Sequence, residues 1–265
     1  MGNKNTSELQ KKSKQKYFEG YGILYDENDK IIYDGSWLNN KKHGYGILYS
    51  TDGSYYQGQW INDQLSGMGI HFYNNGNILY QGNFVNSVYH GYGVTYYDNG
   101  QVSYAGFLQM GKRCGQGIKY RPNGSKLYEG SWSNDERNGY GIYYDENGIK
   151  KYEGECQDGK ACGQGIQYYD CGSIKYSGKW HNNNANGKGI KYRVDGSIKY
   201  DGEWSDNKYH GSGKQIYKNG TLKIKGFWKQ GKKNGRGISF YQNGNIEYNG
   251  IWQDDILVEG TISWS

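Results

Sequence analysis

The 265-residue sequence has one proline, three methionines and six phenylalanines, and it contains no long apolar run. A membrane-spanning helix needs about 18 consecutive apolar residues, so the sequence predicts none. Residues 1–16 also lack the apolar segment of a secretory signal. The four cysteines, Cys114, Cys156, Cys162 and Cys171, have no CxxC spacing. We therefore expect reduced thiols on the cytoplasmic side of the cell.

Aromatic and glycine residues replace the missing aliphatic ones. The chain has 30 tyrosines, 8 tryptophans and 44 glycines, and its formal net charge is only +6. A sequence poor in aliphatic residues favours disorder when taken alone. Here tyrosine and tryptophan supply the apolar surface that a core requires. This composition is typical of β structure with many turns.

A glycine recurs along the chain with constant spacing. These anchor glycines are 35, 58, 82, 106, 130, 154, 178, 202, 226 and 250; the first gap is 23 residues and every later gap is 24. An aromatic residue stands two positions before most anchors and a tryptophan two positions after most of them. The two columns contain Tyr33, Tyr56, Tyr80, Tyr104, Tyr128, Tyr152, Tyr176, Tyr200 and Tyr248, and Trp37, Trp60, Trp132, Trp180, Trp204, Trp228 and Trp252. Polar residues lie between them, so the alternation predicts a strand with one buried face.

A second signature, Gly-x-Gly followed by an aliphatic residue, begins nine residues after each anchor, as at Gly44 and Gly46. It predicts a second strand. Asn-Gly pairs such as Asn75-Gly76 follow, and they predict tight hairpins in which both turn residues have a positive φ. Two glycines without a third are a poor match to a dinucleotide-binding fingerprint. The glycines instead predict a close backbone approach or a bulge.

The composite pattern of Tyr-x-Gly-x-Trp, Gly-x-Gly-x-Ile-x-Tyr and Asn-Gly closely resembles the MORN repeat. The resemblance covers about residues 18–255 and implies an all-β fold, an elongated antiparallel β-hairpin meander of about ten 23–24-residue repeats. Residues 1–16 are then a flexible basic tail, residues 17–255 the repeat array and residues 256–265 a modified C-terminal cap. One local departure is Lys214, which replaces the usual aliphatic residue.

The aromatic columns have two interpretations. They form the buried core of a thin sheet, or one edge of them stays open as a partner groove. A column of histidines and cysteines precedes the Gly-x-Gly signatures, but equivalent residues of neighbouring repeats should lie about 9–10 Å apart. Zinc ligands must converge on one ion at roughly 2.0–2.3 Å. We therefore expect no metal site, no cofactor and no catalytic residues.

The N-terminal tail matches an N-myristoylation pattern, with Gly2 followed by Thr6. Five lysines accompany it: Lys4, Lys11, Lys12, Lys14 and Lys16. One acyl chain binds membranes only marginally, and a polybasic patch is the usual second signal. The tail is either a lipid anchor with membrane-contacting lysines or a solvated basic segment, and both interpretations stay open.

Similarity to MORN proteins implies a non-catalytic scaffold that positions protein partners in a cytoskeletal, ciliary or membrane-associated assembly, often as a homodimer. The alternative is a peripheral membrane protein whose repeats bind acidic phospholipids such as phosphoinositides. The repeat array is nearly neutral, whereas nucleic-acid binding needs concentrated positive charge. We therefore expect no nucleic-acid partner.

Overall fold

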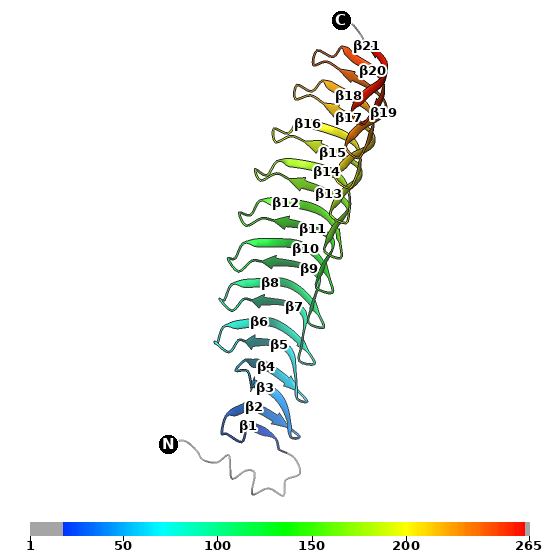
Figure 1. Cartoon of the computed structure of the whole chain (residues 1–265). Helices are drawn as coiled ribbons and strands as arrows, with labels where there is room; N and C mark the ends of the chain where they lie inside the picture. Colours follow the sequence, from blue (N-terminus) through cyan, green and yellow to red (C-terminus); the bar gives the residue numbers. More distant parts are fainter. Residues whose placement is uncertain (1–17, 263–265) are drawn as a thin grey trace. The chain divides into compact units, whose positions relative to one another are not determined.

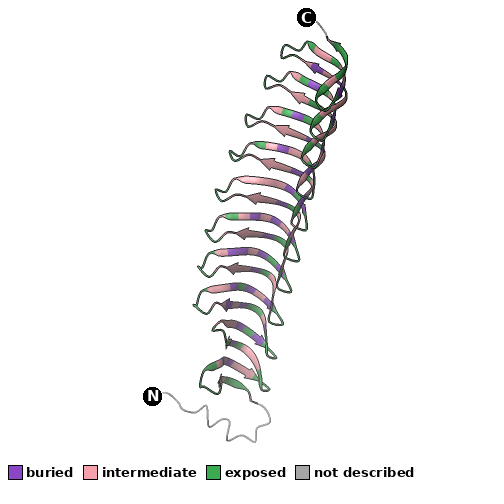
Figure 2. Ribbon diagram, in the orientation of Figure 1, coloured by how far each residue is buried: buried purple, intermediate pink, exposed green. Residues whose placement is uncertain are grey.

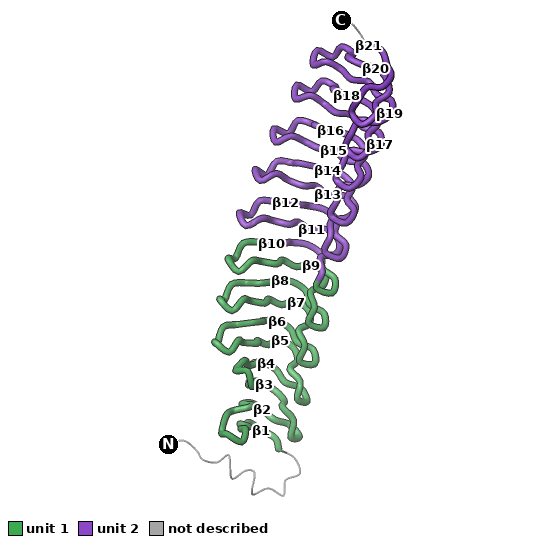
Figure 3. Tube along the Cα trace, viewed as in Figure 1, with its two compact units in different colours: residues 1–126, 132–135 green, residues 127–131, 136–265 purple. Residues whose placement is uncertain are grey.

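The computed structural model describes residues 18–262, and every regular element in that range is a β-strand. The predicted all-β class is confirmed. Contacts divide the chain into two compact units (Figure 3). Unit 1 comprises residues 1–126 and 132–135, and unit 2 comprises residues 127–131 and 136–265.

The strands of unit 1 are β1 (Gly20–Tyr25), β2 (Ile31–Leu38), β3 (Lys41–Tyr49), β4 (Tyr55–Ile61), β5 (Gln64–Phe72), β6 (Ile78–Val85), β7 (Val88–Tyr96), β8 (Val102–Gln109) and β9 (Lys112–Tyr120). Strand β10 (Lys126–Ser133) contributes residues to both units. Within unit 1 each strand pairs antiparallel with the next strand of the chain (Figure 1). This is the predicted hairpin meander.

The strands of unit 2 are β11 (Glu136–Tyr144), β12 (Lys150–Gln157), β13 (Lys160–Tyr168), β14 (Ile174–His181), β15 (Asn184–Tyr192), β16 (Ile198–Ser205), β17 (Lys208–Ile216), β18 (Leu222–Lys229), β19 (Lys232–Phe240), β20 (Ile246–Gln253) and β21 (Ile256–Ile262). They pair antiparallel in chain order as well. Each repeat therefore adds two strands to its unit.

The glycines are needed because tyrosine rings lie across them. Tyr33 is fully buried, and its hydroxyl donates a hydrogen bond to the carbonyl oxygen of Ser36 at 3.1 Å. A Cβ added at Gly35 or Gly46 would collide with this ring. Gly35 pairs with Gly46, and the register shifts just beyond this pair, between Gly35 and Trp37. The glycines thus provide the close approach and the bulge that the spacing predicted.

Tyrosine and tryptophan alternate in the core of each unit. The Tyr176 ring of unit 2 makes edge-to-face contacts with Trp180 and Trp204, with ring centroids 5.2 and 5.1 Å apart. The Trp204 indole N–H donates to the carbonyl oxygen of Gly189 at 2.9 Å. Aromatic pairs prefer this edge-to-face geometry, and the O–H of a buried tyrosine or the N–H of a buried tryptophan usually has a hydrogen-bond partner. Buried positions recur along the strands of both units accordingly (Figure 2).

The predicted turn type at the Asn-Gly pairs is wrong. In the hairpin after β5 only Gly76 has a positive φ, of 85°, and the backbone N–H of Tyr73 donates to the carbonyl oxygen of Asn77 at 2.8 Å. The Asn75 side chain accepts a hydrogen bond from the N–H of Asn77 at 2.9 Å, which makes a local Asx turn. This leaves three residues in the loop, and such a loop needs a single residue with positive φ.

Two-residue turns with two positive φ angles occur at the other end of the hairpins. Asn62 and Asp63 have φ values of 49° and 71°, and Asn182 and Asn183 have 47° and 67°. Their sequences vary from repeat to repeat. A turn search that relies on Asn-Gly therefore assigns this geometry to the wrong end of the strand.

Candidate functional site

The predicted aromatic columns lie in the cores of the two units. Most of their members are buried, and Trp37, Tyr56, Tyr152 and Tyr248 are half-buried. Burial raises the pKa of Tyr33 and of Tyr80 to about 12, because the charged phenolate would lose its hydration. These columns stabilise the fold through ring contacts with one another.

Two cavities of unit 2 open along the same columns. One cavity, of 380 Å³, is lined by Tyr152, Cys156 and Trp180 among others. Cys156 occupies a tryptophan position of the repeat. The other, of 330 Å³, is lined by Tyr176 and Trp204 among others. These small cavities lie along the predicted partner groove, which stays a prediction.

The larger cavity lies on the opposite face of the strands. We define the outer face as the side turned away from the tyrosine and tryptophan columns. In each Gly-x-Gly signature, two side chains lie on the outer face. The first is the residue between the two glycines, and these residues together are called here the middle column. The second is the aliphatic residue that follows the signature. The register pairs each with a residue next to an anchor glycine, as in Tyr45 with Gln59 and Ile47 with Gln57.

The outer face of unit 1 is aromatic and nearly uncharged. Its middle column contains Tyr21, Tyr45, Met68, Tyr92 and Gln116, and the first four have exposed fractions of 69, 53, 60 and 55%. Phe107 pairs with Tyr92 and lies edge-on to it at 5.7 Å. These side chains stand in successive repeats, about 10 Å apart. Such large exposed rings contribute little to the core and are typical of a contact surface.

The outer face of unit 2 is charged. Its middle column contains Tyr140, Gln164, Lys188, Ser212 and Arg236. Near its start, Glu153 accepts hydrogen bonds from the Lys150 ammonium at 2.9 Å and from the Tyr140 hydroxyl at 2.7 Å. These two hydrogen bonds hold the pKa of Glu153 below its usual value, and the bond from Lys150 has the larger effect. This carboxylate is therefore already paired within the unit.

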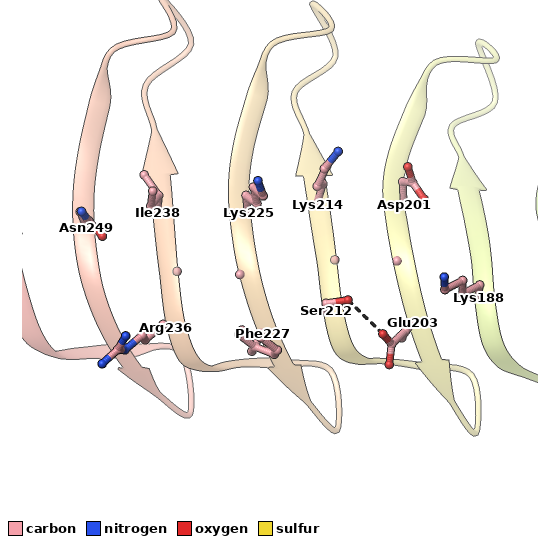
Figure 4. Close-up of a pocket in the computed structure, with 14 residues that line it drawn as sticks. Lys188, Asp201, Glu203, Ser212, Lys214, Lys225, Phe227, Arg236, Ile238 and Asn249 are labelled. Carbon is pink, nitrogen blue, oxygen red and sulfur yellow. Dashed lines mark hydrogen bonds between the residues drawn. The ribbon is translucent and has the colours of Figure 1, made fainter.

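Farther along unit 2 the outer face contains a cavity of 620 Å³, called here the outer groove (Figure 4). Its floor is the backbone of four paired glycines, and two rows of side chains flank it. One row contains Asp201, Lys214, Lys225, Ile238 and Asn249; the other contains Lys188, Glu203, Ser212, Phe227 and Arg236. The register places the first row across β16 to β20 and the second row across β15 to β19.

Charge is distributed unevenly within the outer groove. Asp201 and Glu203 stand on β16, and Glu203 accepts a hydrogen bond from the Ser212 hydroxyl at 2.9 Å. Lys214, Lys225 and Arg236 stand on the next three strands, and within residues 18–262 none of them forms an ion pair. The site can therefore bind an anionic group between β17 and β19. At its β16 end the carboxylates of Glu203 and Asp201 stand opposite Lys188 and Lys214, so this end is less favourable to an anion.

The sequence contained one signal of this groove, the lysine at position 214. The remaining groove residues were missed, because the residue between two glycines varies from repeat to repeat and shows no pattern in the sequence. Only the register brings these residues into one column within each unit. Gly2 and the five tail lysines lie outside the described residues. Within residues 18–262 no three or more His, Cys, Asp or Glu side chains converge to hold a metal ion, and no helix is long and apolar enough to cross a membrane.

Comparisons with known proteins agree with the repeat geometry. A family model described as MORN repeat matches nine segments: residues 33–55, 56–78, 80–102, 104–126, 128–150, 152–172, 176–198, 200–222 and 225–246. About ten repeats were expected. The hairpin of β20 and β21 follows the last matched segment, and it still pairs Gly250 with Gly260 as the other repeats pair their glycines. A search of curated proteins gives no match.

One solved structure, a mutant Tc holotoxin pore of Photorhabdus luminescens, is similar at 10% sequence identity and a TM-score of 0.17. The similarity covers 86% of this chain but only 16% of that one. A likeness this slight supports no conclusion about the site.

Proposed function

Since this chain belongs to the MORN-repeat family, we propose that it is a non-catalytic scaffold that binds protein partners on the outer faces of its two units. MORN repeats are in general protein- or lipid-binding modules, and the meander of strands leaves one face of each unit outside the core. The observation that carries the proposal is the exposed middle column of unit 1, with Tyr45, Met68 and Tyr92 each more than half exposed.

Affinity purification of the tagged protein from its native cells tests this proposal. The variant Tyr45→Ser/Met68→Ser/Tyr92→Ser removes the aromatic and apolar side chains of three neighbouring repeats without touching the core. The matched control, Gln81→Ser, changes an exposed outer-face residue that carries no large apolar group. We expect co-purifying proteins to be lost from the first variant and retained by the second, with melting temperatures unchanged. Equal recovery with all three proteins contradicts the proposal.

The assembly in which the scaffold acts is proposed from family resemblance: cytoskeleton, cilium or a membrane-associated structure on the cytoplasmic side. Fluorescence microscopy of the tagged chain tests this location. The resemblance also supports homodimer formation, which light scattering of the purified chain would measure. A diffuse signal throughout the cytoplasm would argue against all three structures.

Binding of acidic phospholipids is the second candidate. It is favoured by Lys214, Lys225 and Arg236, which form no ion pair within residues 18–262. The tail adds the proposed Gly2 anchor. Vesicle flotation with the intact, acylated chain and with a chain lacking residues 1–16 separates the contributions of tail and repeats. Intact mass of the native protein shows whether the acyl group is present. If the acylated chain stays in solution beside anionic vesicles, both membrane proposals fail.

A further inference from the structure

The outer groove of unit 2 contains an arrangement of charge that the repeat does not require. At the position of Lys214, Ile190 and Ile238 stand in the neighbouring repeats. The register places Lys214 directly opposite Lys225 on β18, and on its other side opposite Asp201 on β16. Like charges in directly opposed cross-strand positions repel one another, with Cβ atoms about 5 Å apart. Both lysines are exposed, so the fold gains no buried surface from either ammonium group.

A third cation faces this pair across the groove. Arg236 stands on β19 in the opposite row, with the backbone of Gly226 and Gly237 between the rows (Figure 4). An anion above these glycines would be close to two ammonium groups and one guanidinium. A guanidinium matches a carboxylate with two parallel hydrogen bonds. Such an anion would also relieve the repulsion between Lys214 and Lys225.

The other lining residues favour a peptide. Phe227 is 55% exposed beside the cations, and Ile238 lies in the opposite row, which together offer an apolar contact. Asp201 and Glu203 border the β16 end and would repel the uniform negative charge of an anionic membrane. A peptide can place acidic and apolar side chains one by one. Five strands at about 4.8 Å each span roughly 19 Å, the length of about six extended residues.

We propose that the outer groove binds an extended acidic segment of a protein partner, with its carboxylates between Lys214, Lys225 and Arg236 and an apolar side chain against Phe227. This inference rests on the proposed scaffold function and names the chemistry of one partner. The segment carries no acidic residue where it passes Asp201 and Glu203. Its binding weakens as salt increases, because exposed charges are screened over about 10 Å at 0.1 M ionic strength.

Fluorescence anisotropy with the full chain tests the proposal. The probe is a labelled eight-residue peptide with three glutamates around a central leucine, and the reference peptide has glutamine in place of each glutamate. The test variants are Lys214→Ile, which restores the residue type of the repeat, and Arg236→Gln. The matched control is Lys179→Gln, an exposed outer-face lysine that does not line the groove.

We expect the glutamate peptide to bind at least tenfold more tightly than the glutamine peptide. Each test variant should weaken that binding about fivefold or more, and Lys179→Gln less than twofold. Equal affinity for the two peptides overturns the proposal, as does an equal loss with Lys179→Gln. Binding to phosphatidylserine vesicles through Lys214 and Arg236 without binding to the peptide also overturns it, in favour of lipid.

The failure of this proposal can be told apart from failure of the scaffold function. If native partners are retained by Lys214→Ile and Arg236→Gln but lost from the unit 1 variant, the scaffold function stands and the groove proposal fails. If partners are retained by every outer-face variant, the scaffold function itself fails.

Discussion

The two units have the same core but different outer faces. Tyr80 in unit 1 and Tyr200 in unit 2 are both fully buried and each donates to a backbone carbonyl three residues on. Their outer faces share the same register, yet one presents Tyr45, Met68 and Tyr92 and the other Lys188, Ser212 and Arg236. The core positions are constrained by contact between rings and glycines. The middle column has no such constraint, so its residues can differ for binding.

The largest effect expected concerns the shared tyrosine core at alkaline pH. Burial raises the pKa of Tyr33 and Tyr80 to about 12, against about 10 in an unfolded chain. Stability from these neutral phenols is fully present below pH 10 and is lost as pH rises through 12. We expect a steep fall in urea-unfolding free energy above pH 10. Tyr80→Phe should show a shallower fall, and an unchanged pH profile would contradict the shared-core description.

A smaller but substantial effect is expected from glycine substitutions within unit 2. A Cβ at Gly213 would collide with the ring of Tyr200. At Gly237 the corresponding tyrosine position holds Ile224, and the nearest heavy atom is 3.3 Å away. We expect Gly213→Ala to cost about 2–3 kcal/mol and Gly237→Ala less than about 1 kcal/mol. Equal costs by chemical denaturation would show that backbone conformation, rather than the ring, requires glycine here.

Removing the repulsion between Lys214 and Lys225 should give a modest gain. Lys225→Gln is expected to raise the unfolding free energy by about 0.2–1 kcal/mol. Lys214→Ile should gain less, because it also removes the attraction of Asp201, which the register places opposite Lys214. The double variant should gain less than the sum, because the repulsion can be removed only once. Additive or opposite effects in this double-mutant cycle would mean that the two lysines do not repel one another across the strands.

The smallest effect is expected on the outer face of unit 1. Tyr45→Ser and Tyr92→Ser remove exposed rings, so each should change the unfolding free energy by less than about 0.5 kcal/mol. Thermal unfolding followed by circular dichroism would measure this, with the core variant Tyr80→Ala for contrast. A loss near that of Tyr80→Ala would show that the middle column supports the fold.

The repeat pattern predicted the fold well because a 24-residue period constrains every strand in the same way. Tyr-x-Gly-x-Trp located the buried face, and the structure places Tyr33 over Gly35 as that pattern requires. The turn type at Asn75-Gly76 was missed because a side-chain hydrogen bond to Asn77 competes with the two-residue turn. The half repeat at β1 lies within the predicted array of residues 17–255, and it keeps Gly20 and Gly22 in the usual register although it has no anchor glycine of its own.

The outer groove was harder to predict. Its charge pattern arises from residues on five strands, and only the register brings Lys214 opposite Lys225. In the sequence the two lysines are separated by a hairpin and are unremarkable among 32 basic residues. The sequence therefore predicted the residues that build the fold, whereas the residues that distinguish one repeat from another needed the strand register.

Site-specific photo-crosslinking in cells tests the central claim, that partners bind the outer faces rather than the aromatic columns. A photoreactive amino acid in place of Met68 or Ser212 reports on the two outer faces, and one in place of Lys175, which lines a cavity beside Tyr176 and Trp180, reports on the core side. We predict protein adducts from Met68 and Ser212 and none from Lys175. Adducts from Lys175 alone would contradict the account.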